Sequence, residues 1–377
     1  MRISHQELIA NVLCDQTEIP ASDLTSARLL FGDYRIERTL QISDFVHECS
    51  KTTLPAATVK KTAKGTGIVR YTPWFRSSVP IFDELTIDPN DLKQFELCAE
   101  VKSFMQAQDD MDSSPSTYGL FENLKSASFD YLKSRVDVLN EFVESIRKQL
   151  STPEVKQAIQ QRMKQSQENL ASCKHMVNKL FMKYSALTVL RIDFAYKPKH
   201  EDMLNPELAD LDEGELHAPH QLELLKEQVH QFLNNRRGNK TLKKIIAYIV
   251  KFEHGIRKGY HAHLILFLNG KKYSNDSYYA TYCTKYWVKL TNGKGCTYNC
   301  NLSKNKYRKL GIGLINYHDK EKRDNLMICL QYLCKAEQFF IFKRLGAAKF
   351  KRLQKSLAPV IIAGKAKAGR PRKYKGC

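Results

Sequence analysis

Two apolar runs joined by a short connection constrain the fold of this chain more than any other feature. They are KKIIAYIVKFE at 243–253 and GYHAHLILFLNG at 259–270, and only HGIRKG links them. Runs of this length, rich in β-branched and aromatic residues, are typical of strands, and so short a link predicts an antiparallel hairpin. A hairpin this apolar is expected at the centre of a sheet.

The segments around this hairpin alternate between strand and helix patterns. Together they give the order strand–helix–strand–strand–helix–strand, followed by a final amphipathic helix. This order is the split βαβ pattern of ferredoxin-like folds and predicts an α+β fold: a central antiparallel sheet with helices on one face. The additional elements are a strand at 186–196, helices at 219–235 and 274–290, a strand at 311–317 and the last helix at 322–342.

The residues before the sheet have a different pattern. Apolar residues recur every three or four positions from 132 to 180, and STPE (151–154) supplies a helix N-cap and a first-turn proline. We expect two helices there, packed as a hairpin along a shared seam. The first 118 residues lack clear periodicity, and we expect a mostly helical region of unknown role. The predicted division is 1–118, a helical hairpin at 119–184, the α+β domain at 185–355 and a basic tail at 356–377.

Charge is distributed unevenly along the chain. The net charge is +20, with −5 on residues 1–118 and +25 on residues 119–377. The last 37 residues contain 12 basic side chains and no acidic one. Such a bias favours a nucleic-acid partner, although a highly soluble basic surface has the same composition.

The cellular environment can also be read from composition. No apolar stretch approaches the roughly 20 residues of a membrane span, and the N-terminus is too polar for a secretory signal. Ten scattered cysteines form no disulfide framework. These features predict a cytoplasmic protein with reduced thiols and no membrane partner.

The second strand of the hairpin places two histidines on one face. His261 and His263 are separated by one residue, and alternate residues of a strand share a face. Glu253 ends the partner strand and is the expected third metal ligand, with His254 or water as alternatives. Two imidazoles and a carboxylate leave open positions on a divalent ion, which suits binding of a phosphodiester. Two hydrogen-bonded histidines without a metal are the other interpretation.

The final helix contains a candidate nucleophile. Tyr332 and Lys335 lie three residues apart and share a helix face. Only Tyr332 follows a further strand, on a helix that can cross the metal-binding face of the sheet. The same spacing also occurs in three other pairs, which are Tyr196/Lys199, Tyr282/Lys285 and Tyr286/Lys289.

The order LTVLRIDF, KFEHGIRKGYHAHLILF, LQYLCKAEQ resembles the three motifs of HUH-type single-strand endonucleases. More narrowly, residues from about 180 to 375 resemble the inovirus gene-two replication proteins, the YagK/YfjJ C-terminal domain family. The resemblance implies an initiator of rolling-circle replication of a phage, prophage or plasmid. It implies Mg²⁺ or Mn²⁺ on His261 and His263, with Glu253 at the position of an acidic residue in related initiators.

The same resemblance assigns the chemistry. Tyr332 would attack the scissile phosphate, leaving a 5′-phosphotyrosine link and a free 3′-OH, with Lys335 as its electrostatic partner. The implied partners are single-stranded DNA at a replication origin and the helicase and polymerase of a bacterial host, in whose cytoplasm the protein would act. A single tyrosine in the last motif implies a single-tyrosine mechanism.

Other interpretations stay open at this point. A single-tyrosine HUH transposase would share the chemistry, and a basic DNA-binding regulator would share the fold without activity. The three cysteines at 283, 296 and 300 allow a zinc site, although free thiols fit their loose spacing better. The sequence GRPR (369–372) is typical of minor-groove binding, whereas non-specific phosphate contacts by the tail fit it equally well.

Overall fold

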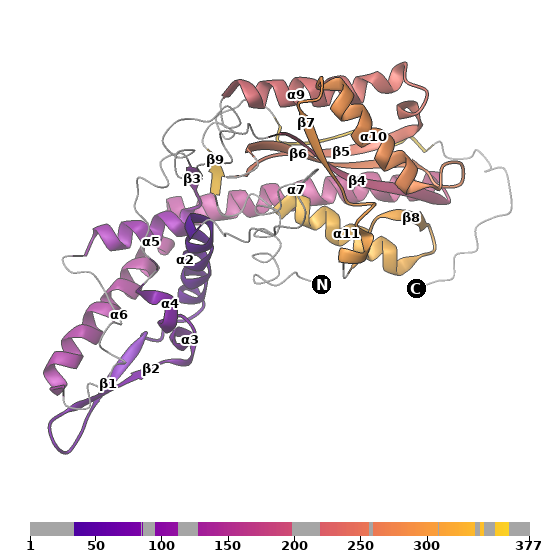
Figure 1. Cartoon of the computed structure of the whole chain (residues 1–377). Helices are drawn as coiled ribbons and strands as arrows, with labels where there is room; N and C mark the ends of the chain where they lie inside the picture. Colours follow the sequence, from indigo (N-terminus) through magenta and orange to yellow (C-terminus); the bar gives the residue numbers. More distant parts are fainter. Residues whose placement is uncertain are drawn as a thin grey trace.

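The computed structural model of the 377-residue chain describes residues 34–83, 85, 95–111, 127–197, 219–255, 259–307, 309–335, 340–342 and 351–361. The protein is a mixed α+β chain in which antiparallel sheets are flanked by helices, after a mostly helical N-terminal region (Figure 1). This confirms the fold class predicted from the sequence.

The main sheet has six strands in the order β10-β5-β6-β4-β7, with β8 also paired to β4, and every pair is antiparallel. The predicted β5–β6 hairpin lies at its centre. Because β4 and β5 are both antiparallel to β6, they run parallel to each other on either side of it, which is the split βαβ arrangement. The strands are β4 Ala186–Tyr196, β5 Ile245–Gly255, β6 Gly259–Asn269, β7 Gly295–Asn299, β8 Gly313–Asn316 and β10 Leu353–Lys355.

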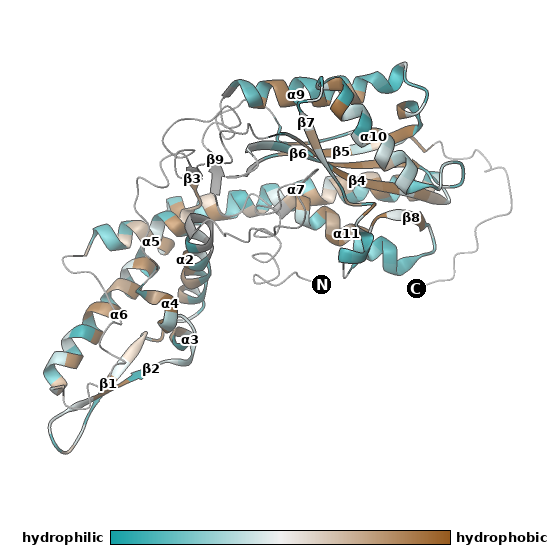
Figure 2. Ribbon diagram, viewed as in Figure 1, coloured by the Kyte–Doolittle hydropathy of each residue, from teal (hydrophilic) through white to brown (hydrophobic). Residues whose placement is uncertain are grey.

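Helices cover both faces of this sheet, so the expectation of helices on one face alone is wrong. Helices α9 (Pro219–Asn234) and α10 (Asp276–Leu290) cover one face, while α7 (Pro153–Lys183) and α11 (Lys320–Lys335) cover the other (Figure 1). The cause lies in β6, which is buried at every position except its last. A strand buried on both sides needs a helical layer on each face, and Figure 2 shows hydrophobic residues along the central strands.

Each layer has its own core. On the α9/α10 face, the Trp287 ring stacks on Phe194 with centroids 4.4 Å apart, and Trp287 Nε1 donates a hydrogen bond of 3.2 Å to the Ala195 carbonyl. On the α7/α11 face, Leu326, Leu330 and Leu333 of α11 are buried in a cluster with residues of α7, β4, β5 and β6. Helix α11, which contains Tyr332, is therefore fixed to the sheet by apolar packing.

Helix α6 (Phe129–Ser151) precedes α7, as the sequence predicts. Thr152 caps α7, accepting a 3.4 Å hydrogen bond from the Val155 amide, and Pro153 occupies its first turn. The predicted shared seam is wrong, because the buried residues of α6 belong to the N-terminal core and those of α7 to the sheet core. A periodic apolar stripe shows that a helix has a buried face without showing which element covers it.

The N-terminal region packs around aromatic residues. The Phe45 ring makes edge contacts with Phe75, Phe82 and Phe104 at centroid distances of 6.0, 5.5 and 6.1 Å. A β-hairpin, which the sequence did not predict, accompanies these helices. The elements are α2 Tyr34–Ser50, β1 Ala57–Lys61, β2 Gly67–Tyr71, α3 Pro73–Arg76, α4 Val79–Phe82, β3 Phe95–Leu97 and α5 Ala99–Asp109.

Two features of the C-terminal half differ from the prediction. Helix α11 ends at Lys335, and Phe340–Phe342 forms strand β9, paired with β3, so the helix predicted at 322–342 is too long. Strand β7 was not predicted, because GCTYN is short and polar. No helix in the described ranges is long and apolar enough to cross a membrane. The GRPR segment lies outside the described residues.

Candidate metal centre

The strand register brings the predicted ligands together. In the β5–β6 hairpin Glu253 lies opposite His261, and across β6 and β4 His263 lies opposite Asp193. Residues directly opposite in an antiparallel sheet share a face. Since His261 and His263 alternate along β6, all four side chains belong to the α7/α11 face. This confirms that both histidines share a face and that Glu253 lies within reach of them.

The cluster is compact and almost completely buried. The side chains of His261 and His263 are 3% and 1% exposed, and that of Glu253 is 14% exposed. Glu253 Oε2 lies 3.1 Å from His263 Nε2 and 3.8 Å from His261 Nε2. One ligand atom from each residue falls within 4.8 Å of the others, so the three can bind one metal ion. Glu253 thus lies where the sequence analysis expected the third ligand.

Each histidine is oriented through its other ring nitrogen. Nδ1 of His263 donates a 2.7 Å hydrogen bond to Asp193 Oδ1, and Nδ1 of His261 donates a 3.1 Å hydrogen bond to the Gly259 carbonyl. Both bonds direct Nε2 toward Glu253. A carboxylate or carbonyl on the second nitrogen is the usual arrangement around metal-binding histidines, because it fixes the tautomer and the ring orientation.

Electrostatics couple His263 to the two acids. Burial is the largest single influence on the pKa of Glu253 and would raise it, but the charge and hydrogen bond of His263, together with the charges of Lys251 and His261, lower that pKa to about 2. Burial alone would lower the pKa of His263, but the carboxylates of Asp193 and Glu253 raise it to about 10. Without a metal, the His263 ring is therefore a cation between two anions. A divalent ion bound to Nε2 would replace that proton with a larger positive charge.

One further observation indicates that these ligands suit a divalent ion. Glu253 Oε1 is buried and makes no hydrogen bond with the described residues. A buried carboxylate oxygen without a partner is costly, and coordination to a cation would remove that cost. Two imidazole nitrogens and a carboxylate are ligands that first-row divalent metals accept.

Tyr332 lies on the same face of the sheet as the cluster. The Arg191 guanidinium carbon is 5.5 Å from the centre of the Tyr332 ring, and Arg191 precedes Asp193 by two residues on β4. Tyr332 itself is 8% exposed. Helix α11 therefore crosses the sheet face that holds the histidines, as expected from the sequence. Lys335 is the last residue of α11, and its side chain lies outside the described residues.

The competing tyrosines lie on the opposite face. Tyr282 and Tyr286 are on α10, where their hydroxyls contact the side chains of Asn239 and Asn235. Tyr196 packs in the α9/α10 core and donates a 2.7 Å hydrogen bond to Gln228 Oε1. The choice of Tyr332 from its position in the sequence agrees with this placement.

Sequence reasoning missed three charged residues of the site. Asp193 and Arg191 lie in LRIDF, and alternation along that apolar strand could have placed both on one face. Lys251 lies opposite His263 on β5 and is only 1% exposed. A charged residue inside an otherwise apolar strand is the signal that could have identified each of them, since charges are rarely buried without a partner.

The cysteines suggested as zinc ligands do not cluster. Cys283 is buried on the α9/α10 face, whereas Cys300 is buried on the other. Cys296 donates to the Tyr196 carbonyl at 3.2 Å. Within the described residues, the metal-ligand cluster of three or more residues is the one formed by Glu253, His261 and His263.

The fold and site thus define a class: an α+β protein whose central antiparallel sheet carries a His-His-Glu cluster beneath a tyrosine-bearing helix. The family model of the YagK/YfjJ C-terminal domain matches residues 148–343, just over half of the chain. The chain belongs to this family. The matched region contains α7, the central strands of the sheet and α11. Comparison with curated proteins and with solved structures gives no match.

Proposed function

We propose that this protein is a metal-dependent, site-specific single-strand DNA endonuclease and strand transferase of the HUH type, which starts rolling-circle replication of a phage, prophage or plasmid. One observation carries the proposal. The His-His-Glu cluster and Tyr332 share one face of the sheet, while the three other tyrosines with the same spacing to a lysine lie on the opposite face. The net charge of +25 on residues 119–377 supports a polyanionic substrate.

The chemistry is a transesterification. The Tyr332 oxygen attacks the scissile phosphorus, the bond to the 3′ oxygen breaks, and the products are a 5′-phosphotyrosine and a free 3′-OH. The phenol loses one proton and the departing oxygen gains one, so the reaction has no net proton change. Because the phosphodiester energy is kept in the tyrosine ester, the same site can rejoin the strand when synthesis ends.

The residues of the site have distinct roles in this reaction. His261, His263 and Glu253 would hold Mg²⁺ or Mn²⁺, which when bound would act as a Lewis acid toward a non-bridging phosphate oxygen. Asp193 holds the His263 ring in place through its 2.7 Å hydrogen bond. Arg191 places a positive charge beside the ring of Tyr332, where negative charge develops on deprotonation. Lys335 is proposed as a second positive group near that tyrosine.

The test is formation of a covalent adduct. The full chain is incubated with single-stranded origin DNA and Mn²⁺, and the products are separated on a denaturing gel. We expect an adduct in the wild type that disappears with EDTA and in Tyr332→Phe. Tyr282→Phe and Tyr286→Phe, on the opposite face, are the matched controls and should retain it. Loss of the adduct in either control, with retention in Tyr332→Phe, would show that the nucleophile is another residue.

The two alternatives give different results in the same assay. A single-tyrosine transposase would form the adduct on hairpin-shaped element ends and not on a replication origin. A DNA-binding regulator without activity would form none on any cognate DNA and would still bind it. The proposal places the protein in a bacterial cytoplasm, with the host helicase and polymerase as its partners.

A further inference from the structure

The β1–β2 hairpin of the N-terminal region presents one face to solvent. Thr58 lies opposite Arg70 and Lys60 lies opposite Ile68, so these four side chains share a face. All four are exposed. The other face of the hairpin is packed against α6 so closely that a Cβ on Gly67 would lie 2.9 Å from Leu132 Cδ1. The hairpin thus has one covered face and one open face.

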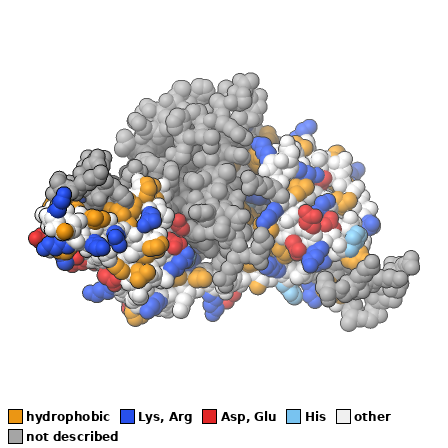
Figure 3. Space-filling model, turned by 90° about the horizontal axis from the view of Figure 1, so that it is seen from below, with side chains coloured by type: hydrophobic (Ala, Val, Ile, Leu, Met, Phe, Trp, Pro, Cys, Tyr) orange, Lys and Arg blue, Asp and Glu red, His pale blue; other side chains and the backbone are white. Residues whose placement is uncertain are grey.

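The open face carries the basic side chains of Lys60 and Arg70, in a basic stretch of an otherwise acidic part of the chain. Residues 51–82 contain six basic side chains and no acidic one, although residues 1–118 have a net charge of −5. Lys60, Lys64 at the hairpin turn, and Arg70 form no ion pair within the described residues, whereas exposed Lys133 on nearby α6 pairs with Asp137. Lys and Arg side chains are visible at this end of the molecule (left in Figure 3).

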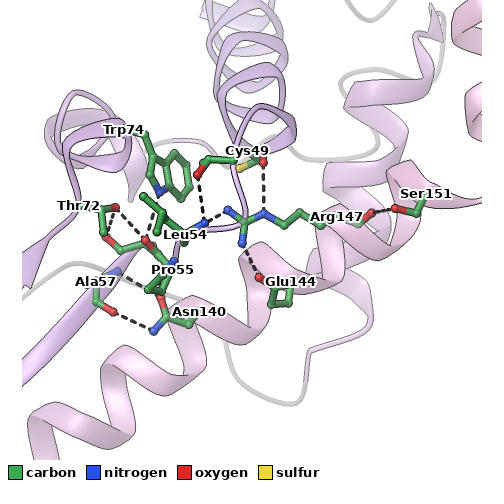
Figure 4. Close-up of polar contacts among 12 residues, drawn as sticks. Cys49, Leu54, Pro55, Ala57, Thr72, Trp74, Asn140, Glu144, Arg147 and Ser151 are labelled. Atoms are coloured by element: carbon green, nitrogen blue, oxygen red, sulfur yellow. Dashed lines mark hydrogen bonds and ion pairs between the residues drawn. The ribbon is translucent and has the colours of Figure 1, made fainter.

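The hairpin is held rigidly on its base. Asn140 of α6 accepts hydrogen bonds from the Ala56 and Ala57 amides at 2.9 and 3.2 Å and donates one to the Ala57 carbonyl at 3.0 Å (Figure 4). Arg147 of α6 donates to the Leu54 carbonyl at 2.7 Å. Further along the hairpin, the Phe129 amide donates to the Gly65 carbonyl at 3.2 Å. Its cationic side chains are therefore displayed on a fixed backbone, which lowers the ordering cost of binding.

The shape and side chains of this face fit double-stranded DNA. The major groove is about 12 Å wide and admits a two-stranded β-ribbon. Single-strand binding surfaces, by contrast, rely on aromatic rings on which bases stack, and the open face (Thr58, Lys60, Ile68 and Arg70) has none. We propose that the β1–β2 hairpin binds the phosphate backbone of duplex DNA, at a site separate from the His-His-Glu cluster. This inference rests on the proposed function for its choice of DNA as the partner.

The experiment measures duplex binding separately from cleavage. Full-length protein is titrated into a fluorescein-labelled blunt duplex in EDTA, and anisotropy is followed at several salt concentrations. For Lys60→Gln/Lys64→Gln we expect weaker binding and a salt slope of log K smaller by about 1.8, or about 0.9 for each lost phosphate contact. Lys60→Arg/Lys64→Arg should bind like the wild type.

A matched pair of lysines provides the control. Lys156 and Lys164 on α7 are also exposed and form no ion pair within the described residues, so Lys156→Gln/Lys164→Gln should retain the wild-type slope. The hairpin variant should also form the Tyr332 adduct on a short single strand at the wild-type rate. If the wild type forms no adduct, the proposed function fails while the duplex measurement still stands.

Three results would overturn the inference. The first is an unchanged affinity and slope in the hairpin variant. The second is an equal loss in the control variant, which would mean a general effect of charge. The third is a parallel loss of adduct formation on the short single strand, which would place the hairpin at the cleavage site.

Discussion

His263 donates a 2.7 Å hydrogen bond from Nδ1 to Asp193 Oδ1, across the central strand pair β6–β4. This bond directs Nε2 of the same ring toward Glu253, 3.1 Å away. A residue of β4 therefore orients a metal ligand on the neighbouring strand β6. Asp193 is the side chain through which β4 contributes to the metal centre.

Removing Asp193 should weaken metal binding. We expect Asp193→Ala to lower Mn²⁺ affinity by about 10- to 100-fold, because the His263 ring loses the partner that fixes its orientation. Isothermal titration calorimetry with Mn²⁺ measures the change. Asp137→Ala, which removes an exposed carboxylate paired with Lys133 on α6, should bind Mn²⁺ like the wild type. Equal affinities for Asp193→Ala and wild type would exclude this role.

Metal binding should stabilise the fold through the cluster. At a free Mn²⁺ concentration 100 times the Kd, we expect the free energy of unfolding to rise by about 2.7 kcal/mol. Thermal unfolding with Mn²⁺ and with EDTA measures the difference. His261→Ala should lose most of the Mn²⁺ effect, whereas His230→Ala, at an exposed histidine that contacts Gln354, should keep it. An equal Mn²⁺ effect in both variants would place the metal elsewhere.

Metal affinity should depend on pH in a defined direction. The metal-free His263 has its pKa raised to about 10, so it is protonated throughout pH 6–8 and Mn²⁺ must displace that proton. We therefore expect Mn²⁺ affinity to increase about tenfold per pH unit over this range, with release of about one proton. Calorimetry in two buffers of different ionisation enthalpy measures the released proton. A pH-independent affinity would contradict a protonated His263.

Without metal, the stabilisation of the fold by His263 should decrease as pH rises, whereas Mn²⁺ affinity increases. The pKa of His263 is raised from 6.5 to about 10 in the folded state. Its contribution to stability is therefore complete below pH 6.5 and is lost as pH rises toward about 10. The lowered pKa of Glu253, about 2, contributes stability above its ordinary value of 4.5 that is lost as pH falls. In EDTA, the contribution of this pair should decline from pH 6.5 upward in chemical denaturation, and Asp193→Asn should reduce the slope.

Arg191 should act on the nucleophile and not on the metal. We expect Arg191→Gln to slow adduct formation on the order of tenfold, because a charge 5.5 Å from the Tyr332 ring is lost. Arg191→Lys should recover part of the rate. The pH dependence of the adduct rate should move to higher pH in Arg191→Gln, while Mn²⁺ affinity stays unchanged. A normal rate profile with reduced Mn²⁺ affinity would contradict this assignment.

Gly311 should control the position of α11. A Cβ there would lie 2.5 Å from the backbone of Asn325 and Leu326, so Gly311→Ala must displace the helix that contains Tyr332. We expect a loss of stability of about 1–3 kcal/mol and slower adduct formation. Gly238→Ala, where a Cβ meets nothing within 4 Å, should change neither. Denaturant unfolding and the gel assay measure both effects.

The sequence predicted the parts of the fold that depend on local pattern. The β5–β6 hairpin follows from its apolar runs and short link, and the start of α7 follows from Thr152 and Pro153. The partners of helices could not be predicted in the same way. The apolar stripes of α6 and α7 have the same period, yet the two helices pack in different cores. Strand β9 pairs with β3, although most of the sequence lies between them. Such pairings depend on tertiary contacts that no local pattern records.

The sequence predicted those site residues whose positions follow from side-chain alternation along a strand and from the hairpin. His261 and His263 share a face because they are two residues apart, and Glu253 follows from the hairpin. Asp193 could not be assigned to them, because its contact depends on the neighbour of β6 being β4 and on the register of that pair. The tyrosine was selected by its place in the order of elements, and the sheet topology then puts the competitors on the other face.

Helix α7 links the two ends of the molecule. Near its middle, Arg162 forms an ion pair with Glu100 of α5, and Ser166, one turn later, donates a 3.0 Å hydrogen bond to the Cys334 carbonyl of α11. An unbroken helix of 31 residues has a fixed rise of about 1.5 Å per residue, so it holds these two contacts at a set separation. A duplex held by the hairpin and a strand cut at Tyr332 would then keep a fixed helical phase. Five base pairs inserted between them, half of a turn of about 10.5, would turn the bound groove to the wrong side of the DNA.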